Sequence, residues 1–175
     1  MENKILITDN IVIENNVEEQ NIISLNKFII LCFITFWLYN LWWTYKAWRF
    51  FKQKEKSNIM PAARALFGIF FLNSLFTKIL ELAREKGYKE NYSSVSLFIC
   101  FFISNILAYL PNPFWLITTL SFVFTIPPFK ALNYAKENST KFTVNEQKSF
   151  SGRQIVLLVF GLIFWALILL GLSRQ

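Results

Sequence analysis

Long apolar runs, separated by short polar and basic stretches, set the pattern of this chain. An α-helix that crosses a bilayer needs about 20 mostly apolar residues, and four of the runs approach or reach that length. We therefore predict an all-α integral membrane protein whose helices form a bundle. Its four membrane segments are expected at about residues 28–48, 94–110, 113–127 and 153–173. The last is the clearest membrane helix, because it is long, free of charge over 155–172 and preceded by a capping box, Ser151 with Gln154.

A fifth apolar region, at about 61–86, changes character along its length. Pro61 suits the first turn of a helix. From Leu72 onward, a rotation of about 100° per residue gathers the polar and charged side chains on one side. The other side carries Leu72, Leu75, Phe76, Ile79, Leu82 and Ala83. This pattern predicts an amphipathic helix that is interfacial or re-entrant.

The sequence Pro111-Asn112-Pro113 separates the two middle segments. Asn112 can cap the following helix and Pro113 can occupy its first position, so an antiparallel hairpin with almost no loop is expected. At ~1.5 Å per residue, an arm of about 16 residues spans roughly 24 Å, less than the ~30 Å hydrocarbon core. Either polar flanks lengthen the arms or the tip stays in the far leaflet. Pro127-Pro128 should end or kink the second arm.

The polar ends and linkers complete the organisation. Residues 1–26 are expected to be a polar, largely disordered tail without the features of a secretory signal. Residues 27–173 then form a single helical membrane domain. Within it, 129–151 is a basic linker, with a short helix expected around 131–136.

The placement of basic residues predicts the orientation. Most of the 18 Lys and Arg residues form three clusters: one follows the first apolar segment, one lies at 78–89 near the end of the region at 61–86, and one precedes the last segment. Basic residues concentrate in cytoplasmic loops. All three clusters can be cytoplasmic if 61–86 does not span the membrane, and both termini would then lie outside.

Composition narrows the classes of function. The chain is 54% hydrophobic and only 17% charged, with a net charge of +7. Its bases flank apolar segments, so anionic lipid headgroups are the expected partner and nucleic acid is not. Histidine is absent and Asp9 is the only aspartate. We therefore expect no zinc site, no cofactor and no His-based catalysis.

Two sets of residues are candidates for function. Amides inside a membrane either bond between helices or line a solute pathway, and the candidates are Asn40, Asn73 and Asn105. Aromatic and basic residues at the membrane interface contact headgroups. The candidates for that role are Trp42, Trp43, Lys46, Arg49 and Arg64.

Residues 39–48 read Tyr-Asn-Leu-Trp-Trp-Thr-Tyr-Lys-Ala-Trp, an aromatic–Lys motif. With Arg64-Ala65-Leu66-Phe67 and Pro128-Phe129-Lys130, it resembles a family of small uncharacterised bacterial multi-pass inner-membrane proteins, a domain of unknown function. The resemblance covers roughly 28–172. It implies a bacterial inner-membrane location and a similar helical layout, and it implies no activity.

Three hypotheses of function follow. The first is a non-enzymatic membrane protein that acts by interaction with lipid, with another membrane protein or with further copies of itself. The second is a small oligomeric transporter or channel for an ion or small solute. The third, which the residues favour least, is a membrane-embedded lipid-modifying enzyme that uses Glu81, Lys78 or Tyr45.

Overall fold

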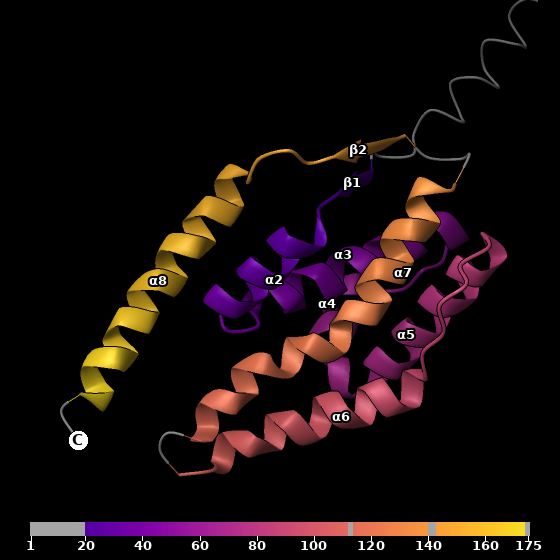
Figure 1. The fold of residues 1–175 in the computed structure, drawn as a ribbon. Helices are drawn as coiled ribbons and strands as arrows, with labels where there is room; N and C mark the ends of the chain where they lie inside the picture. Colours follow the sequence, from indigo (N-terminus) through magenta and orange to yellow (C-terminus); the bar gives the residue numbers. More distant parts are fainter. Residues whose placement is uncertain (1–19, 112–113, 140–142, 174–175) are drawn as a thin grey trace, which may run out of the picture.

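The computed structural model describes residues 20–111, 114–139 and 143–173, which form seven α-helices, two 3-10 helices and two short strands (Figure 1). The α-helices are α2 (Leu25–Ile34), α3 (Leu38–Glu55), α4 (Pro61–Leu66), α5 (Gly68–Glu85), α6 (Ser94–Ile106), α7 (Ile126–Glu137) and α8 (Gly152–Leu172). The 3-10 helices are η1 (Leu107–Tyr109) and η2 (Phe114–Thr125), and the strands are β1 (Gln20–Ile22) and β2 (Val144–Glu146). The predicted all-α class is confirmed for these residues.

Among the described residues, two helical stretches are long and apolar enough to cross a membrane: Phe114–Glu137 and Gly152–Leu172. They differ in their surroundings. In the most apolar 18-residue stretch of the first, 44% is buried by the rest of the protein. In the corresponding stretch of the second, only 6% is buried. An exposed apolar helix of 21 residues matches the length of a membrane span. The other apolar helices, Leu25–Ile34 and Ser94–Tyr109, are shorter.

The expected continuous segment at 28–48 is wrong, because it is two helices that fold back on each other. The rings of Phe28 in α2 and Trp43 in α3 lie 5.8 Å apart. In one straight helix, 15 residues would separate them by roughly 22 Å. The chain reverses at Phe36 and Trp37, whose φ angles are 48° and 62°.

Thr35 explains why the helix stops at this point. Its Oγ1 donates a hydrogen bond to the Leu31 carbonyl at 2.7 Å and accepts one from the Tyr39 amide at 3.1 Å. The hydroxyl therefore serves backbone groups on both sides of the turn, which offers the chain an alternative to continuing the helix. Thr35 is buried, so these bonds are shielded from water.

The core is built around the aromatic side chains of this hairpin. Phe28 stacks on Phe129 of α7 with ring centroids 4.1 Å apart, and Trp43 packs at the edge of the same pair. Trp48 and Phe51 are fully buried one and two turns further along α3. Part of the aromatic cluster expected at the membrane interface is therefore interior packing.

Helix α5 confirms the amphipathic pattern expected from residue 72 onward. All six residues of its predicted apolar side are buried, and the opposite side is polar and partly exposed. It packs against α6 and α7. The region at 61–86 is not one helix, however, because it breaks at Phe67 between α4 and α5.

The expected hairpin between the middle segments is present, and α6 lies along η2. Its turn residues Asn112 and Pro113 lie outside the described residues. The second arm begins as 3-10 helix over η2, which rises ~2.0 Å per residue, so 12 residues extend about 24 Å instead of the ~18 Å of an α-helix. Pro127-Pro128 does not end this arm; the pair lies in the first turn of α7, where a missing N–H costs no hydrogen bond.

The end of the expected N-terminal tail is ordered. Strand β1 pairs with β2 in parallel, with Gln20 opposite Val144 and Ile22 opposite Glu146. Lys27 Nζ adds bonds to the carbonyls of Gln147 and Lys148 at 2.5 and 2.7 Å. Residues 1–19 of the tail lie outside the described residues.

This pairing corrects the expected orientation. The segment before α2 and the basic linker before α8 lie side by side in this pairing, and hydrogen-bonded strands cannot lie on opposite sides of a bilayer. The prediction that placed the first outside and the second in the cytoplasm is therefore wrong. The sequence pattern missed the pairing because each strand has only three residues.

Helix α8 starts with the predicted capping box, in which Ser151 Oγ accepts from the Gln154 amide and Gln154 Oε1 accepts from the Ser151 amide. It touches the rest of the protein along one narrow line. Gln154 and Gly161 are its only buried residues among those described, and Trp165 stacks on Phe33 of α2 at 5.3 Å. Leu157 and Leu158 pack against the core and are partly buried, and most of the other apolar side chains of α8 are exposed.

Candidate functional site

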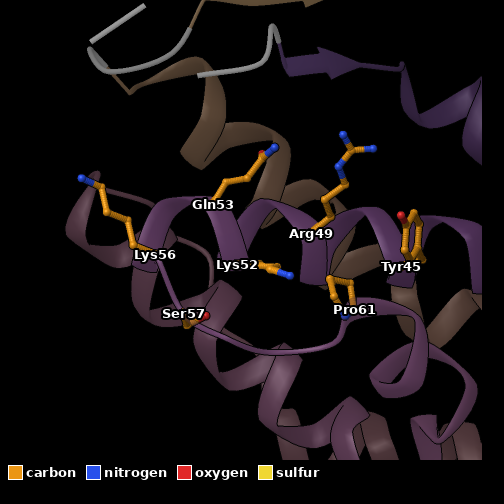
Figure 2. Close-up of a pocket in the computed structure, with 7 residues that line it drawn as sticks. All are labelled: Tyr45, Arg49, Lys52, Gln53, Lys56, Ser57 and Pro61. Atoms are coloured by element: carbon orange, nitrogen blue, oxygen red, sulfur yellow. The ribbon is translucent and has the colours of Figure 1, made fainter. Parts of the chain in front are cut away.

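An open groove of about 540 Å³ runs along the second half of α3 (Figure 2). Most of the residues that line it carry a polar or basic group. The residues that line it are Tyr45, Arg49, Lys52, Gln53, Lys56, Ser57 and Pro61. We call this feature the α3 groove.

Helical spacing and a sharp helix end create the α3 groove. Tyr45, Arg49, Lys52 and Lys56 follow one another at intervals of three or four residues and therefore share one face of the chain. At Lys56 the backbone adopts a left-handed conformation with φ 48°, and the Ser57 amide donates to the Lys52 carbonyl at 3.2 Å. The chain then turns back, and the start of α4 forms the opposite wall (Figure 2).

The groove is electropositive. Arg49, Lys52 and Lys56 contribute three cations, and no acidic residue is among the described residues that line it. The C-terminal end of α3 carries partial negative charge and offsets part of this potential. Ser57 Oγ is buried and has no hydrogen-bond partner among the described residues.

The fold places the five residues expected to contact headgroups at different positions, so they do not form one site. Only Arg49 lines the α3 groove. Lys46 lies 5.8 Å from the exposed Trp42 ring, outside the groove. The Arg64 guanidinium packs over the buried Trp48 ring at 4.5 Å. The assignment of Trp43 as a headgroup contact is wrong, because this side chain is buried in the core.

Sequence reasoning missed four groove residues: Lys52, Gln53, Lys56 and Ser57. A signal was present, because bases recur at helical spacing just before a Ser-Asn-Ile-Met-Pro stretch that stops the helix. The basic cluster was therefore recognised from the sequence. The reversal of the chain at Ser57, which turns the basic face of α3 into a groove, was visible only in the backbone of the structure.

The three candidate amides are also divided. Asn40 and Asn105 line a second cavity, of about 230 Å³, whereas Asn73 does not. Asn105 donates to the Phe101 carbonyl of its own helix at 2.7 Å, and no hydrogen bond from it to another helix is found among the described residues. Asn40 and Asn73 each have a buried Oδ1 without a partner among the described residues.

The groove residues have the chemistry of anion binding. Within the described ranges, no cluster of His, Cys, Asp or Glu is arranged to hold a metal ion. Cys32 is buried and Cys100 exposed, and neither forms a disulfide. Three cations with hydroxyl and amide donors can neutralise and bind a phosphate or sulfate group.

Comparisons with known proteins gave no match to a family model, to a curated protein or to a solved structure.

Proposed function

We propose that this protein is a non-enzymatic, multi-pass membrane protein that binds anionic lipid headgroups in the α3 groove. The observation that carries the proposal is the groove itself. Three basic residues, Arg49, Lys52 and Lys56, line it together with the polar side chains of Tyr45 and Gln53. A lipid phosphate fits this combination of charge and donors.

Exposed apolar surface supports the membrane setting. On α8, large side chains such as Phe160 and Leu167 are 69% and 61% exposed. On the hairpin, α6 has no buried residue and η2 exposes a row of apolar side chains. Soluble monomers rarely expose apolar patches of more than a few hundred Å². Lipid is the solvent that suits such a surface.

The basic clusters meet around α3, which supports a single electropositive side. Lys46 is close enough to Arg49 and Arg153 for charge repulsion, and Lys136 is close enough to Lys46. Lys78 of α5 bonds Glu55 of α3 at 2.7 Å. Bases from all three clusters therefore gather near one helix, which is the arrangement that a cytoplasmic face requires.

The proposed topology follows from these contacts. The segment before α2, the α3 groove and the linker before α8 share the cytoplasmic side, while α2 enters the membrane region and returns as α3. The two arms of the hairpin and α8 cross. In Figure 1 the C-terminal end of α6, the start of η2 and the C-terminal end of α8 lie toward the lower left, away from β1, β2 and the end of α7, as this topology requires. A bacterial inner membrane is proposed from the resemblance of 39–48 to that family.

The test measures lipid binding by the purified full-length protein in detergent. Phosphatidylglycerol and phosphatidylcholine are added in parallel, and the shift in Tm is followed. We expect phosphatidylglycerol alone to raise the Tm of the wild type. At about 1 kcal/mol per base, replacing Arg49, Lys52 and Lys56 by Gln should weaken phosphatidylglycerol binding by roughly 100-fold.

A matched control carries the same change of charge elsewhere. Arg84 lies in the last turn of α5, Lys86 and Lys89 follow it, and none of the three lines the α3 groove. Replacing these three by Gln should leave the binding of phosphatidylglycerol within about twofold of wild type. Equal losses in the two triple variants would contradict a groove site and indicate general attraction to charge.

A further inference from the structure

We infer that this protein is a wedge in one leaflet of the membrane and prefers a bilayer whose cytoplasmic face is convex. The wedge consists of two short hairpins, α2 with α3 and α4 with α5, whose turns reach the same level. The α6–η2 hairpin and α8 continue past that level, toward the lower left of Figure 1. Such a wedge rests on the membrane setting and topology of the proposed function, and it does not depend on the α3 groove.

Helix α8 measures the depth of the α2–α3 turn. Gly161 lies against the Ile34 backbone, and the rings of Phe36 and Trp165 lie 4.6 Å apart. Gly161 and Trp165 follow Gly152, the first residue of α8, by 9 and 13 positions. At ~1.5 Å per residue, the turn therefore lies about 14–20 Å along α8. The midplane of a ~30 Å hydrocarbon core lies about 15 Å below its surface, so the turn reaches the middle of the membrane and does not cross it.

Helix α6 measures the depth of the α4–α5 turn in the same way. Gly68, at the start of α5, lines the second cavity together with Phe101 and Asn105 of α6. Phe101 and Asn105 follow Ser94, the first residue of α6, by 7 and 11 positions. These positions correspond to about 10–17 Å along α6. Trp37, at the α2–α3 turn, lines the same cavity, so the two turns meet near one level.

The exposed side of α5 changes from apolar to polar along the helix axis. Near the turn the strongly exposed residues are apolar: Leu66, Phe67, Ile69 and Phe70. One to two helical turns later, the exposed side chains are those of Ser74 and Thr77. Lys78 then bonds Glu55 of α3 at 2.7 Å. A helix lying flat at an interface keeps one apolar and one polar side along its length. The change along α5 instead indicates a helix that rises from lipid to water.

The two halves of the membrane therefore hold unequal amounts of protein. The cytoplasmic half contains α2, α3, α4, α5 and parts of α6, of α8 and of the arm formed by η2 and α7. Among the described residues, the far half contains only the ends of α6, η1, η2 and α8. A helix with its side chains is ~10–12 Å across, so α2 to α5 add roughly 300–450 Å² to one leaflet. Packed protein resists compression, so the lipids adjust and that leaflet becomes convex.

The test follows membrane tubes pulled from giant phosphatidylcholine vesicles that contain the purified full-length protein. In a Cys100→Ser background, Lys89→Cys places a thiol after α5, and Ser173→Cys places one after α8. A membrane-impermeant fluorescent maleimide, added outside, labels only the molecules whose thiol faces outward. The outer leaflet of a tube is convex. We therefore expect the label of Lys89→Cys to be enriched in the tube by about twofold and that of Ser173→Cys to be depleted.

The depth of the α4–α5 turn is measured separately in bilayers. Phe70→Cys and Thr77→Cys, in the same Cys100→Ser background, place a bimane label on two exposed positions of α5 that are two helical turns apart. The lipids carry bromine either near the end of the acyl chain or near the headgroup. We expect the label at residue 70 to be quenched most by bromine near the chain end, and the label at residue 77 by bromine near the headgroup.

Three results would overturn the inference. Equal distribution of the two maleimide labels between tube and vesicle would exclude a wedge and leave lipid binding in the α3 groove standing, because these vesicles contain no anionic lipid. Quenching of both bimane labels by bromine near the headgroup would show that α5 lies flat. Labelling of both thiols on one molecule of the Lys89→Cys, Ser173→Cys double variant, from outside intact vesicles, would contradict the proposed topology itself and with it the wedge.

Discussion

Gly161 is the position at which α8 is most sensitive to a single added methyl group. It is buried on a helix whose other residues are mostly exposed. A Cβ at this position would lie 2.3 Å from the Ile34 carbonyl oxygen and 2.9 Å from Ile34 Cγ2. Close backbone approach through small residues is a general way for membrane helices to associate. Gly161→Ala should therefore displace α8 from α2.

The size of the effect follows from the overlap. Ordinary contact begins at 3.4 Å, so the Cβ and the Ile34 oxygen must separate by about 1 Å. Forcing an extra carbon into a packed contact costs about 1–3 kcal/mol. The shift would also loosen the stack of Trp165 on Phe33, which lies one turn further along α8.

Gly171 provides the matched control, because a Cβ there meets no atom within 4 Å. Ala is favoured over Gly inside a helix by about 0.8–1 kcal/mol, so Gly171→Ala should be neutral or stabilising. The assay is unfolding in mixed micelles by a titration with sodium dodecyl sulfate, followed by tryptophan fluorescence. We expect Gly161→Ala to unfold at a lower mole fraction of the denaturing detergent than wild type. A Gly161→Ala protein as stable as Gly171→Ala would refute the packing of α8 on α2 at this point.

Two further predictions concern single residues. Lys56→Gly should raise the free energy of unfolding by about 0.5–1 kcal/mol, because glycine adopts the φ of 48° without strain. The same variant should weaken phosphatidylglycerol binding, because it removes a groove cation. Equal or lower stability in the same micelle titration would argue against the left-handed helix end. Gln154→Leu should lower the free energy of unfolding by about 1–3 kcal/mol, because the Gln154 side chain bonds Tyr39, Gln147 and the Ser151 amide. An unchanged free energy of unfolding would mean that this hydrogen-bond network does not hold α8 in place.

Features that depend on local pattern were predictable from the sequence. Helix α8 is a charge-free apolar run preceded by its own capping box, and both features can be recognised from residues that are close together in the sequence. The buried side of α5 follows from helical spacing alone. The hairpin of α6 and η2 follows from two apolar runs with a proline-rich turn between them, although the 3-10 form of the second arm does not.

The candidate sites were predictable only in part. Arg49 and Asn40 were identified by residue type, as a base beside an aromatic cluster and as an amide in an apolar run. The neighbours that line a site together with Arg49 or with Asn40 depend on where the chain turns. Lys56 and Gly68 complete the α3 groove and the second cavity because α3 and α4 end where they do.

The reversal at Phe36 and Trp37 shows why sequence alone was insufficient. A bulky residue with positive φ is locally unfavourable, so no local rule places a turn there. The packing that accompanies it is distant in sequence: Phe36 contacts Phe164 and Trp165 of α8 with ring centroids 5.0 and 4.6 Å apart. Local sequence patterns were enough to show which segments are helical and apolar. Tertiary contacts decided where the first segment reverses, which tryptophans are buried and which side the N-terminal segment shares, since these depend on free energies gained between residues far apart in the chain.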